Sequence, residues 1–369
     1  MKNLLHDIQE IKLMGPGPSC VPDEVYQAMS RYTLGHMDKS FIQIMDGIKA
    51  MQQELMQTEN PLSIPVSGTG SAGMETCFVN LIEPGDNVLI LQNGVFGVRM
   101  EDVAGRLGAN VDVLKAEWGT PIEPAAVAEF LSDKQYKIVA VVHAETSTGV
   151  KNPIEEISPL VKASGALFLV DAVTSFGGIP LNVDANGIDA LYSGTQKCLS
   201  CPPGLSPVTF SDAAVEAIRN RKSKVPNWYL DMNMIIDYWS GKTRVYHHTA
   251  PINMLYGLYQ ALYLILEEGT EHVYARHRQM HELLVRELAD LGLEMLVAPE
   301  YRLPMLNAVI VPDGVDEAKV RAALRDSYSI EIGAGLGPLA GKILRIGLMG
   351  HTARRENVEL VVSALKAVL

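Results

Sequence analysis

Two residues of opposite charge follow successive apolar segments in the middle of the chain. Asp171 ends an apolar run that begins at Leu167, and Lys197 follows the next predicted strand among small and hydroxyl-bearing residues. A lysine amine can form a Schiff base with the aldehyde of pyridoxal phosphate, and a carboxylate can keep the ring nitrogen of that cofactor protonated, so that the ring accepts electrons. The pair therefore predicts a pyridoxal phosphate site with Lys197 and Asp171 as its catalytic residues.

The residues around Lys197 favour a site over two ordinary surface charges. Taken alone, an aspartate at a strand end and a lysine on a turn are most often solvated. Here Ser193-Gly194-Thr195-Gln196 precedes the lysine, and Pro202-Pro203-Gly204 follows it closely. Small and hydroxyl residues allow a ligand to approach, and the prolines fix the following turn.

A glycine-rich turn at residues 67–73, with the sequence SGTGSAG, lies between a predicted strand and a predicted helix. Backbone amides at a helix N-terminus bind anions such as phosphate. The turn also matches G-x-G-x-x-G, so a dinucleotide site is the rival interpretation. That site needs a carboxylate at the end of the next strand, where this chain has Gln92-Asn93-Gly94. A single bound phosphate group is the better prediction.

Three other segments contain candidate ligand-binding residues. Phe96 stands just after a predicted strand, where it could stack on a planar ring or pack in the core. The hydroxyls of the stretch 143–149 could bind a cofactor oxygen or cap a helix. Arg345 is a lone cation in an apolar strand, and a buried arginine needs an anionic partner such as a substrate carboxylate. The adjacent His247 and His248 have no third ligand at a suitable spacing, so no metal is predicted.

Short apolar runs alternate with helix-length segments from residue 62 onwards. This βαβ rhythm predicts an α/β fold with a mostly parallel, seven-stranded sheet between helices. Ligands bind such sheets beyond the carboxyl ends of the strands, where Asp171 is expected. The predicted strands are 62–66, 87–91, 110–114, 137–142, 167–170, 190–192 and 208–210, and two of the predicted helices are 74–81 and 155–163.

The length of 369 residues favours one large and one smaller domain. We expect an N-terminal arm at 1–15, a large cofactor-binding domain at 16–267 and a small C-terminal α/β domain at 268–369. A long helical stretch, 251–291, spans the second boundary. The small domain is expected to contain strands at 308–311, 330–332 and 343–346, helices at 316–326 and from 354, and a loop at 333–341.

Composition excludes several classes of partner. The formal net charge of -12 argues against nucleic acid and against anionic membranes. No apolar run reaches transmembrane length, and the N-terminus lacks the layout of a secretory signal. Four cysteines do not make a disulfide framework, which favours a reducing cytoplasm. Cys198 and Cys201 form a lone C-x-x-C and are expected to be packed thiols.

Taken together and in order, the motifs form a recognisable pattern that spans nearly the whole chain. The chain resembles the class V branch of the fold-type I pyridoxal phosphate aminotransferases, most closely those of the alanine-glyoxylate and serine-pyruvate type. The motifs that carry the resemblance are GPGP, GHMDKSF, SGTGSAGMET, EPGDNVLILQNGVFG, HAETSTGV, VDAVTSFGG, YSGTQKCLSCPPG, YHHTAP and GKILRIGLMG.

The resemblance implies roles for individual residues around the cofactor. Lys197 would be the Schiff-base lysine and proton carrier, and Asp171 the partner of the pyridinium nitrogen. The remaining cofactor contacts would be Val173 and Phe96 on the two ring faces, Thr69, Gly70, Ser71 and Gln196 at the phosphate, and Thr146 near the ring oxygen.

The resemblance also implies a homodimer and a substrate class. Tyr246 and Thr249 would reach the phosphate of the partner subunit, so the two active sites would be shared. Arg345, helped by backbone near Gly17, would bind the α-carboxylate of the substrate. The reaction would be a ping-pong transamination from a small L-amino acid, alanine or serine, to glyoxylate or pyruvate.

Some positions depart from this pattern and keep alternatives open. Ser71 stands where the animal enzymes carry histidine, and Phe96 where they carry tryptophan. The ureidoglycine-glyoxylate type uses amide side chains where this chain has His36 and Tyr246, and a pyridoxamine-pyruvate type needs an acid that the phosphate turn lacks. A pyridoxal phosphate lyase or desulfurase is a further alternative, although a desulfurase needs a mobile cysteine.

Overall fold

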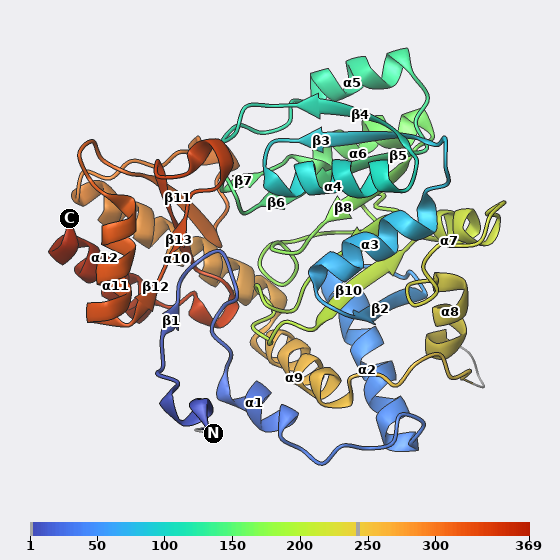
Figure 1. Cartoon of the computed structure of the whole chain (residues 1–369), viewed down its shortest axis with the longest axis horizontal. Coiled ribbons are helices and arrows are strands. Elements are labelled where there is room, and N and C mark those ends of the chain that lie inside the picture. The colour runs from blue at the N-terminus through green and yellow to red at the C-terminus, as the bar shows by residue number, and fades with distance from the viewer. Residues whose placement is uncertain (1–2, 241–243) are drawn as a thin grey trace.

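A seven-stranded sheet forms the centre of the larger part of the molecule (Figure 1). The computed structural model describes residues 3–240 and 244–369. All strands of the sheet run parallel except β10, which is antiparallel to both neighbours. The order across the sheet is β2 (Leu62–Ser67), β10 (Leu205–Phe210), β9 (Ala190–Tyr192), β8 (Leu167–Asp171), β5 (Ile138–Val142), β3 (Asn87–Gln92) and β4 (Asn110–Lys115). The predicted mostly parallel seven-stranded sheet is confirmed.

Helices cover both faces of this sheet, which explains why its strands are apolar runs without alternation. All five residues of β5, Ile-Val-Ala-Val-Val, are buried. Figure 1 shows α3 and α4 in front of the sheet and α6 behind it. The connecting helices are α3 (Gly70–Leu81), α4 (Val95–Arg106), α5 (Pro124–Asp133), α6 (Ile154–Ser164) and α7 (Asp212–Arg219).

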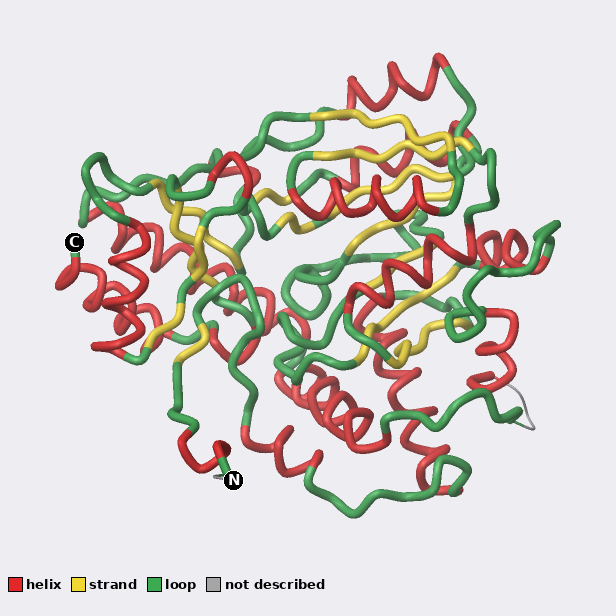
Figure 2. Tube along the Cα trace, viewed as in Figure 1, coloured by secondary structure: helices red, strands yellow, loops and turns green. Residues whose placement is uncertain are grey.

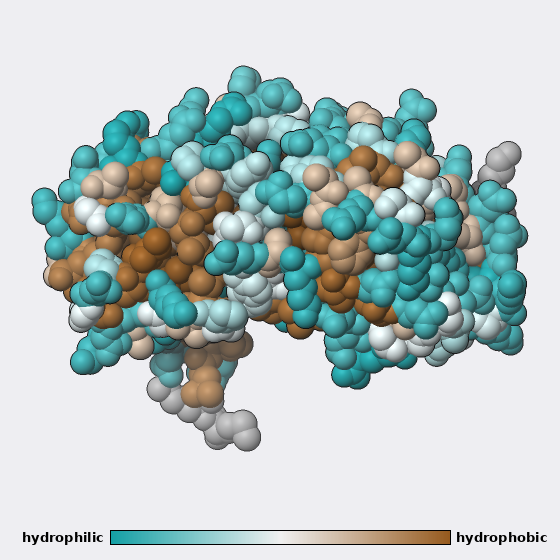
Figure 3. All heavy atoms as spheres, turned by 90° about the horizontal axis from the view of Figure 1, so that it is seen from above, coloured by the Kyte–Doolittle hydropathy of each residue, from teal (hydrophilic) through white to brown (hydrophobic). Residues whose placement is uncertain are grey.

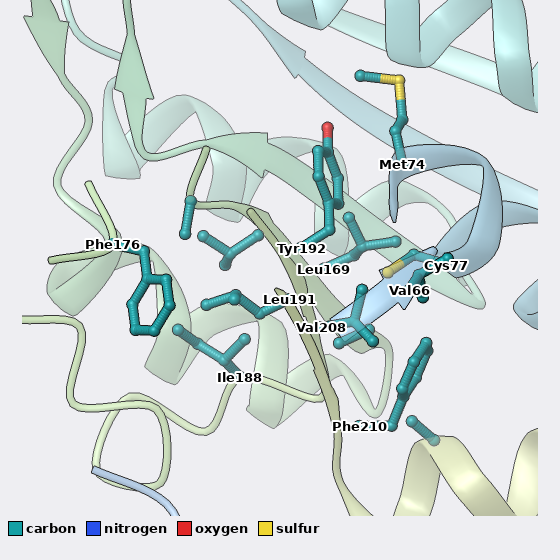
Figure 4. Packing of buried hydrophobic residues seen from close by; sticks show 14 of the residues in the cluster. Val66, Met74, Cys77, Leu169, Phe176, Ile188, Leu191, Tyr192, Val208 and Phe210 are labelled. Atoms are coloured by element: carbon teal, nitrogen blue, oxygen red, sulfur yellow. The ribbon is translucent and has the colours of Figure 1, made fainter. Parts of the chain in front are cut away.

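Four more helices complete the large unit. The long α9 packs against both α1 and α2, and α2 also lies against β2. Their bounds are α1 (Asp23–Met29), α2 (Lys39–Met56), α8 (Met232–Ser240) and α9 (Ile252–Glu268). The core between sheet and helices contains large apolar side chains, such as Tyr192 and Phe210 from strands and Phe176 from the turn after β8 (Figure 4).

A second, smaller core lies in the C-terminal part of the chain, around Leu284, Leu324 and Ile346. Three short strands pair antiparallel in the order β11-β14-β13, and helices cover them (Figure 2). The elements are α10 (Thr270–Asp290), β11 (Leu306–Ile310), α11 (Glu317–Tyr328), β12 (Ile330–Glu331), β13 (Gly333–Ala334), β14 (Ile343–Gly347) and α12 (Arg355–Val368).

Two predicted boundaries were wrong by three residues or more, and one predicted loop contains a short strand and a 3-10 turn. The stretch 333–341 is not a continuous loop, because Gly333–Ala334 pair with β14 and Gly337–Leu339 form a 3-10 turn. Helix α3 begins at Gly70, four residues before its predicted start, and β10 begins at Leu205, three residues early. In each case glycine, serine or proline hides the element, since these residues have weak propensity for helix or strand and are ordered by tertiary pairing.

The N-terminal segment is attached to the C-terminal unit. Strand β1 (Lys12–Leu13) pairs parallel with β12, and Met14 belongs to the smaller core. This pairing leads the chain from the C-terminal unit to the turn at Pro16 and Gly17. The domain boundaries at residues 15/16 and 267/268 stay a prediction.

The surface is mixed in character. Viewed from above, hydrophilic side chains cover much of the large unit, and apolar side chains gather over the C-terminal unit (Figure 3). Within residues 3–240 and 244–369, no helix combines the length and apolar character needed to cross a membrane.

His277 of α10 joins this helix to the 3-10 turn Gly350–Thr352 inside the protein. Its Nδ1 donates to the Val273 carbonyl at 2.7 Å, and its Nε2 accepts from the Gly350 amide at 2.9 Å. These partners fix the neutral tautomer with the proton on Nδ1. Burial, the largest cause, lowers the pKa of His277 to about 4.

Replacing His277 by Ala should lower the free energy of unfolding by roughly 2–4 kcal/mol at pH 7, since the change opens a cavity and leaves the Gly350 amide unpaired. The pKa of His277 is about 4 in the folded protein and about 6.5 in the unfolded chain. The neutral imidazole therefore stabilises the folded protein fully above pH 6.5, and this stabilisation is lost as the pH falls toward about 4. The difference in the free energy of unfolding between wild type and variant, measured by urea unfolding, should therefore decrease from pH 7 to pH 4. A difference that is constant with pH, or equal to that of the exposed control His272→Ala, contradicts this.

Candidate active site

Lys197 lies buried on the tight turn that follows β9, with 8% of its surface exposed. Its Nζ donates to the carbonyl of Pro16, and a side chain at Gly17 would place a Cβ 2.6 Å from Nζ. Gly17 also has φ of +110°, which favours glycine. Burial first, and then the charge of Arg345, lowers the pKa of Lys197 to about 8. The amine is therefore partly neutral near physiological pH, as a nucleophile must be.

Asp171 is the last residue of β8 and is buried. Its Oδ1 accepts from the Val173 amide at 2.8 Å, and its Oδ2 accepts from the Tyr192 hydroxyl at 2.7 Å. Burial raises the pKa of Asp171 to about 6, and these two donors together with the charge of Lys197 act against that rise. The carboxyl group is thus held in one orientation at the carboxyl end of the sheet.

Tyr192 is a site residue that sequence reasoning missed. It ends β9 and is paired in register with Asp171 on the adjacent parallel strand. Two strand-terminal residues of neighbouring parallel strands must lie side by side, so the strand order, had it been known, could have identified it.

The turn between β2 and α3 presents a helix N-terminus to solvent. Thr69 is the N-cap, and among the described residues no side chain caps the helix. Thr69 and Ser71 are exposed, whereas Gly70 is buried against Val173 and the backbone of residues 193–194. Unpaired amides and the helix dipole favour an anion here.

Gln196 joins this turn to the lysine. A Cβ built at Gly194 would lie 2.6 Å from Gln196 Oε1 and 3.4 Å from the Gly70 Cα, so the three residues are close neighbours. Gln196 Oε1 is buried and has no hydrogen-bond partner among the described residues. An amide with unused hydrogen-bonding capacity beside a helix N-terminus suits a polar ligand.

Arg345 lies in the centre of β14 with 6% of its surface exposed. Its Nε donates to the Ala334 carbonyl at 2.6 Å and one terminal nitrogen donates to the Thr146 carbonyl at 3.0 Å. None of the ion pairs recorded for the described residues includes it, and burial lowers its pKa to about 10. A guanidinium with five N-H donors keeps donors free for an anion.

Phe96 stands in the first turn of α4, beside a second acid that sequence reasoning missed. The guanidinium carbon of Arg99 lies 5.0 Å from the centroid of the Phe96 ring. The Phe96 amide donates to Glu145 Oε2 at 3.2 Å. Glu145 is buried and belongs to the motif HAETSTGV, in which the sequence predicted a role only for the hydroxyl groups. An acid in a short polar stretch after a buried strand was the available signal.

Among the described residues, neither Tyr246 nor Thr249 has a recorded contact with Lys197. Tyr246 is 55% exposed, its hydroxyl lies 3.3 Å from Thr249 Oγ1, and its ring lies 5.0 Å from that of His36. The segment is tied to the phosphate turn by His248, whose Nε2 lies 2.8 Å from the Ser67 hydroxyl.

The adjacent histidines and the cysteines of the C-x-x-C were the remaining candidates for a metal site. Among the described residues, no three His, Cys, Asp or Glu side chains gather so that they could hold a metal ion. Cys198 and Cys201 are buried free thiols whose pKa burial raises to about 12, so the expectation of packed thiols is confirmed.

Comparisons with known proteins agree on one family. The family model for aminotransferase class-V matches residues 11–361. Alanine-glyoxylate aminotransferase of Rattus norvegicus is 42% identical over 97% of this chain and 87% of the rat protein, and (S)-ureidoglycine-glyoxylate transaminase of Bacillus subtilis is 39% identical over 97% and 90%. The crystal structure of alanine-glyoxylate aminotransferase from Nostoc sp. has a TM-score of 0.96 and 46% identity, and covers 100% of this chain and 99% of that one. The chain belongs to the class-V aminotransferases.

Members of this family depend on pyridoxal phosphate, so the predicted fold-type I enzyme and its cofactor are both supported. The buried residues fit that group. An amine of lowered pKa, an oriented carboxylate and an uncapped helix N-terminus converge from three elements. They match the aldehyde, the ring nitrogen and the phosphate of the cofactor in chemistry.

Replacing Tyr192 by Phe removes one of the two donors to Asp171, so the pKa of Asp171 should rise further above about 6. At pH 7 a larger fraction of Asp171 is then protonated, and the dissociation constant of pyridoxal phosphate should increase about tenfold. The loss of cofactor affinity should become smaller toward pH 9, where Asp171 is ionised in both wild type and variant. Titration with pyridoxal phosphate at several pH values measures it.

A matched control is Tyr136→Phe. Tyr136 also donates its hydroxyl to an aspartate, Asp112, at 2.8 Å, but it lies away from the residues of the site. The Tyr136→Phe variant should bind pyridoxal phosphate with the same affinity as wild type. Equal affinity of wild type and Tyr192→Phe from pH 6 to 9 would show that Asp171 does not need this donor.

Proposed function

We propose that this aminotransferase transfers the amino group of a small L-amino acid, alanine or serine, to glyoxylate or pyruvate by a ping-pong mechanism. The observation that carries the proposal is a buried amine of lowered pKa close to a carboxylate and to a buried guanidinium for which no ion pair is recorded among the described residues. The names of the rat and Nostoc relatives support alanine as donor and glyoxylate as acceptor.

When bound, the cofactor supplies an aldehyde that exchanges with amino groups and a ring that takes up electrons. Lys197 is proposed to bind it covalently and, once freed by the substrate amine, to carry a proton on Nζ as general base and then as general acid. Asp171 is proposed to keep the ring nitrogen protonated. Arg345, with backbone near Gly17, is proposed to bind and orient the substrate carboxylate, which both the amino acid and the oxo acid carry.

The remaining contacts hold the cofactor in place. Val173 and Phe96 would hold the two faces of the ring, and Thr146 would lie near the ring oxygen. The phosphate is bound by the turn residues and the adjacent amide, which are Thr69, Gly70, Ser71 and Gln196. The uncapped N-terminus of α3 supports this arrangement.

We also propose that the protein forms a homodimer whose two subunits share their active sites. Its proposed compartment is the cytoplasm. Tyr246 and Thr249 are proposed to reach the phosphate bound in the partner subunit. Their exposure, and their position beside His36 rather than beside Lys197, support this assignment. Four free cysteines are consistent with a reducing compartment.

An alternative is another class V reaction, of the ureidoglycine-glyoxylate or pyridoxamine-pyruvate type. The Bacillus relative keeps the first possibility open, but the ring pair of His36 and Tyr246 replaces amide groups with aromatic ones. A desulfurase is disfavoured because Cys198 and Cys201 are buried and of high pKa.

The absorption spectrum of the purified protein tests the reaction. The visible band of the bound cofactor should disappear with L-alanine and return with glyoxylate. Lys197→Ala should bind pyridoxal phosphate without a covalent bond and lose turnover at least a thousandfold, since one residue supplies both attachment and proton transfer. Steady turnover with alanine in that variant would refute the role of Lys197, and a band that responds only to a different amino acid would change the substrate.

Replacing Arg345 by Gln should raise the KM for the amino acid and for the oxo acid by roughly 100-fold, because the carboxylate loses a charged donor pair. Cofactor affinity should stay within a few-fold of wild type. Arg355→Gln is the control, since Arg355 lies exposed on α12 beside Glu359. If Arg345→Gln weakens cofactor binding and leaves both KM values unchanged, Arg345 does not bind the carboxylate.

A further inference from the structure

A short hairpin lies between α4 and the C-terminal unit. It consists of β6 (Ala144–Glu145) and β7 (Val150–Lys151), joined by residues 146–149. It follows β5 directly, so it starts from the carboxyl edge of the sheet, where Asp171 and Lys197 also lie.

One side of the hairpin holds the start of α4. Glu145 Oε1 accepts from the Ser147 hydroxyl at 2.6 Å and from its amide at 3.0 Å. Glu145 Oε2 accepts from the Phe96 amide, and the Ser147 hydroxyl oxygen accepts from the Val95 amide at 3.0 Å. Gly94, the N-cap residue of α4, offers no side chain. The Glu145-Ser147 pair therefore caps this helix from another element.

The close approach of the two elements depends on Gly94. A Cβ built on Gly94 would overlap Cγ and Cδ of Glu145. Its backbone is extended, with φ of -179°, so glycine is required here by space and not by conformation. The carboxylate is thereby packed directly against the start of the helix that carries Phe96.

The other side of the hairpin holds the C-terminal unit. The Thr146 carbonyl accepts from Arg345, and the Gly149 carbonyl accepts from the Leu303 amide at 3.1 Å. Residues 144–149 thus contact, within one turn, both the helix start that presents Phe96 and the guanidinium proposed to bind the substrate.

We propose that Glu145 is a positioning residue for the cofactor ring: through its bond to the Phe96 amide it fixes the aromatic side chain that stacks on the ring. The inference rests on the proposed placement of the ring against Phe96. Every recorded partner of the Glu145 side chain is a donor, and a glutamine here would put an amide nitrogen, which cannot accept, in place of one acceptor oxygen. Burial raises the pKa of Glu145 to about 7, and the donors from Ser147 and Phe96 act against that rise. Nearby charges from Asp171, Lys197 and Arg345 complete its surroundings.

A double-mutant cycle tests whether Glu145 acts through Phe96. Glu145→Gln and Phe96→Ala should each raise the dissociation constant of pyridoxal phosphate about tenfold. If Glu145 acts by placing Phe96, the double variant should be weakened about tenfold and not a hundredfold. The circular dichroism of the visible cofactor band, which reports how rigidly the ring is held, should fall to the same level in all three variants.

Glu101→Gln is the matched control, because Glu101 is a glutamate on α4 itself that accepts from the Gln92 side chain at 2.8 Å and not from the helix start. It should keep wild-type affinity and dichroism. If Glu145→Gln does not fold, Ser147→Ala removes the Val95 cap and should give a few-fold loss that is absent in the Phe96→Ala background.

A hundredfold, additive loss in the double variant overturns the proposal, as does wild-type affinity and dichroism in Glu145→Gln. Failure of the proposed function is a different result. A wild type that binds cofactor but transfers no amino group between the proposed substrates changes the reaction, whereas an additive cycle in an active enzyme removes only the role of Glu145.

Discussion

The burial of Lys197 and Asp171 at one edge of the sheet is the constraint on which the site depends. Removing a charged group from water disfavours its charged form, so the pKa of the lysine falls to about 8 and that of the aspartate rises to about 6. The pKa values of both groups therefore move toward neutral pH, and no direct ion pair is recorded for either of them among the described residues. Neutral donors and acceptors hold them instead, from Tyr192, Val173 and Pro16.

This arrangement requires a sheet that is covered on both faces. Only a strand buried on both sides can deliver a carboxylate into a site away from water, and β8 and β9 do so as adjacent parallel strands. The cost of burying these polar groups is offset by the large apolar core behind them. The polar groups at the edge of the sheet therefore depend on the apolar strands that place them there.

The C-terminal unit contributes through two separate connections. Strand β1 pairs with β12 and thereby sets Pro16 and Gly17 against Lys197. Strand β14 presents Arg345, whose charge further lowers the pKa of the lysine. The position of this unit therefore influences both the geometry and the electrostatics of the amine.

The sequence predicted those parts of the fold and site that local chemistry marks. Buried strands are continuous apolar runs, and Asp171, Lys197 and Arg345 stand out as single charges in apolar or small surroundings. Tyr192 and Glu145 were missed because their importance comes from strand order and from a contact between distant segments. Strand β13 was missed because glycines carry no strand signal, and only its pairing with β14 defines it.

The same electrostatics explain how one site can serve both halves of the proposed reaction. The amino acid and the oxo acid of the proposed reaction both carry a carboxylate next to the carbon that reacts. In the proposed function the guanidinium on β14 therefore binds both, while Lys197 on another element carries the proton. Arg345 has backbone carbonyls as its recorded partners. Among the described residues no acid forms a direct ion pair with it, although the charge of Glu145 acts against the lowering of its pKa by burial. The site is thus organised before substrate arrives, and binding energy is not spent on breaking an ion pair.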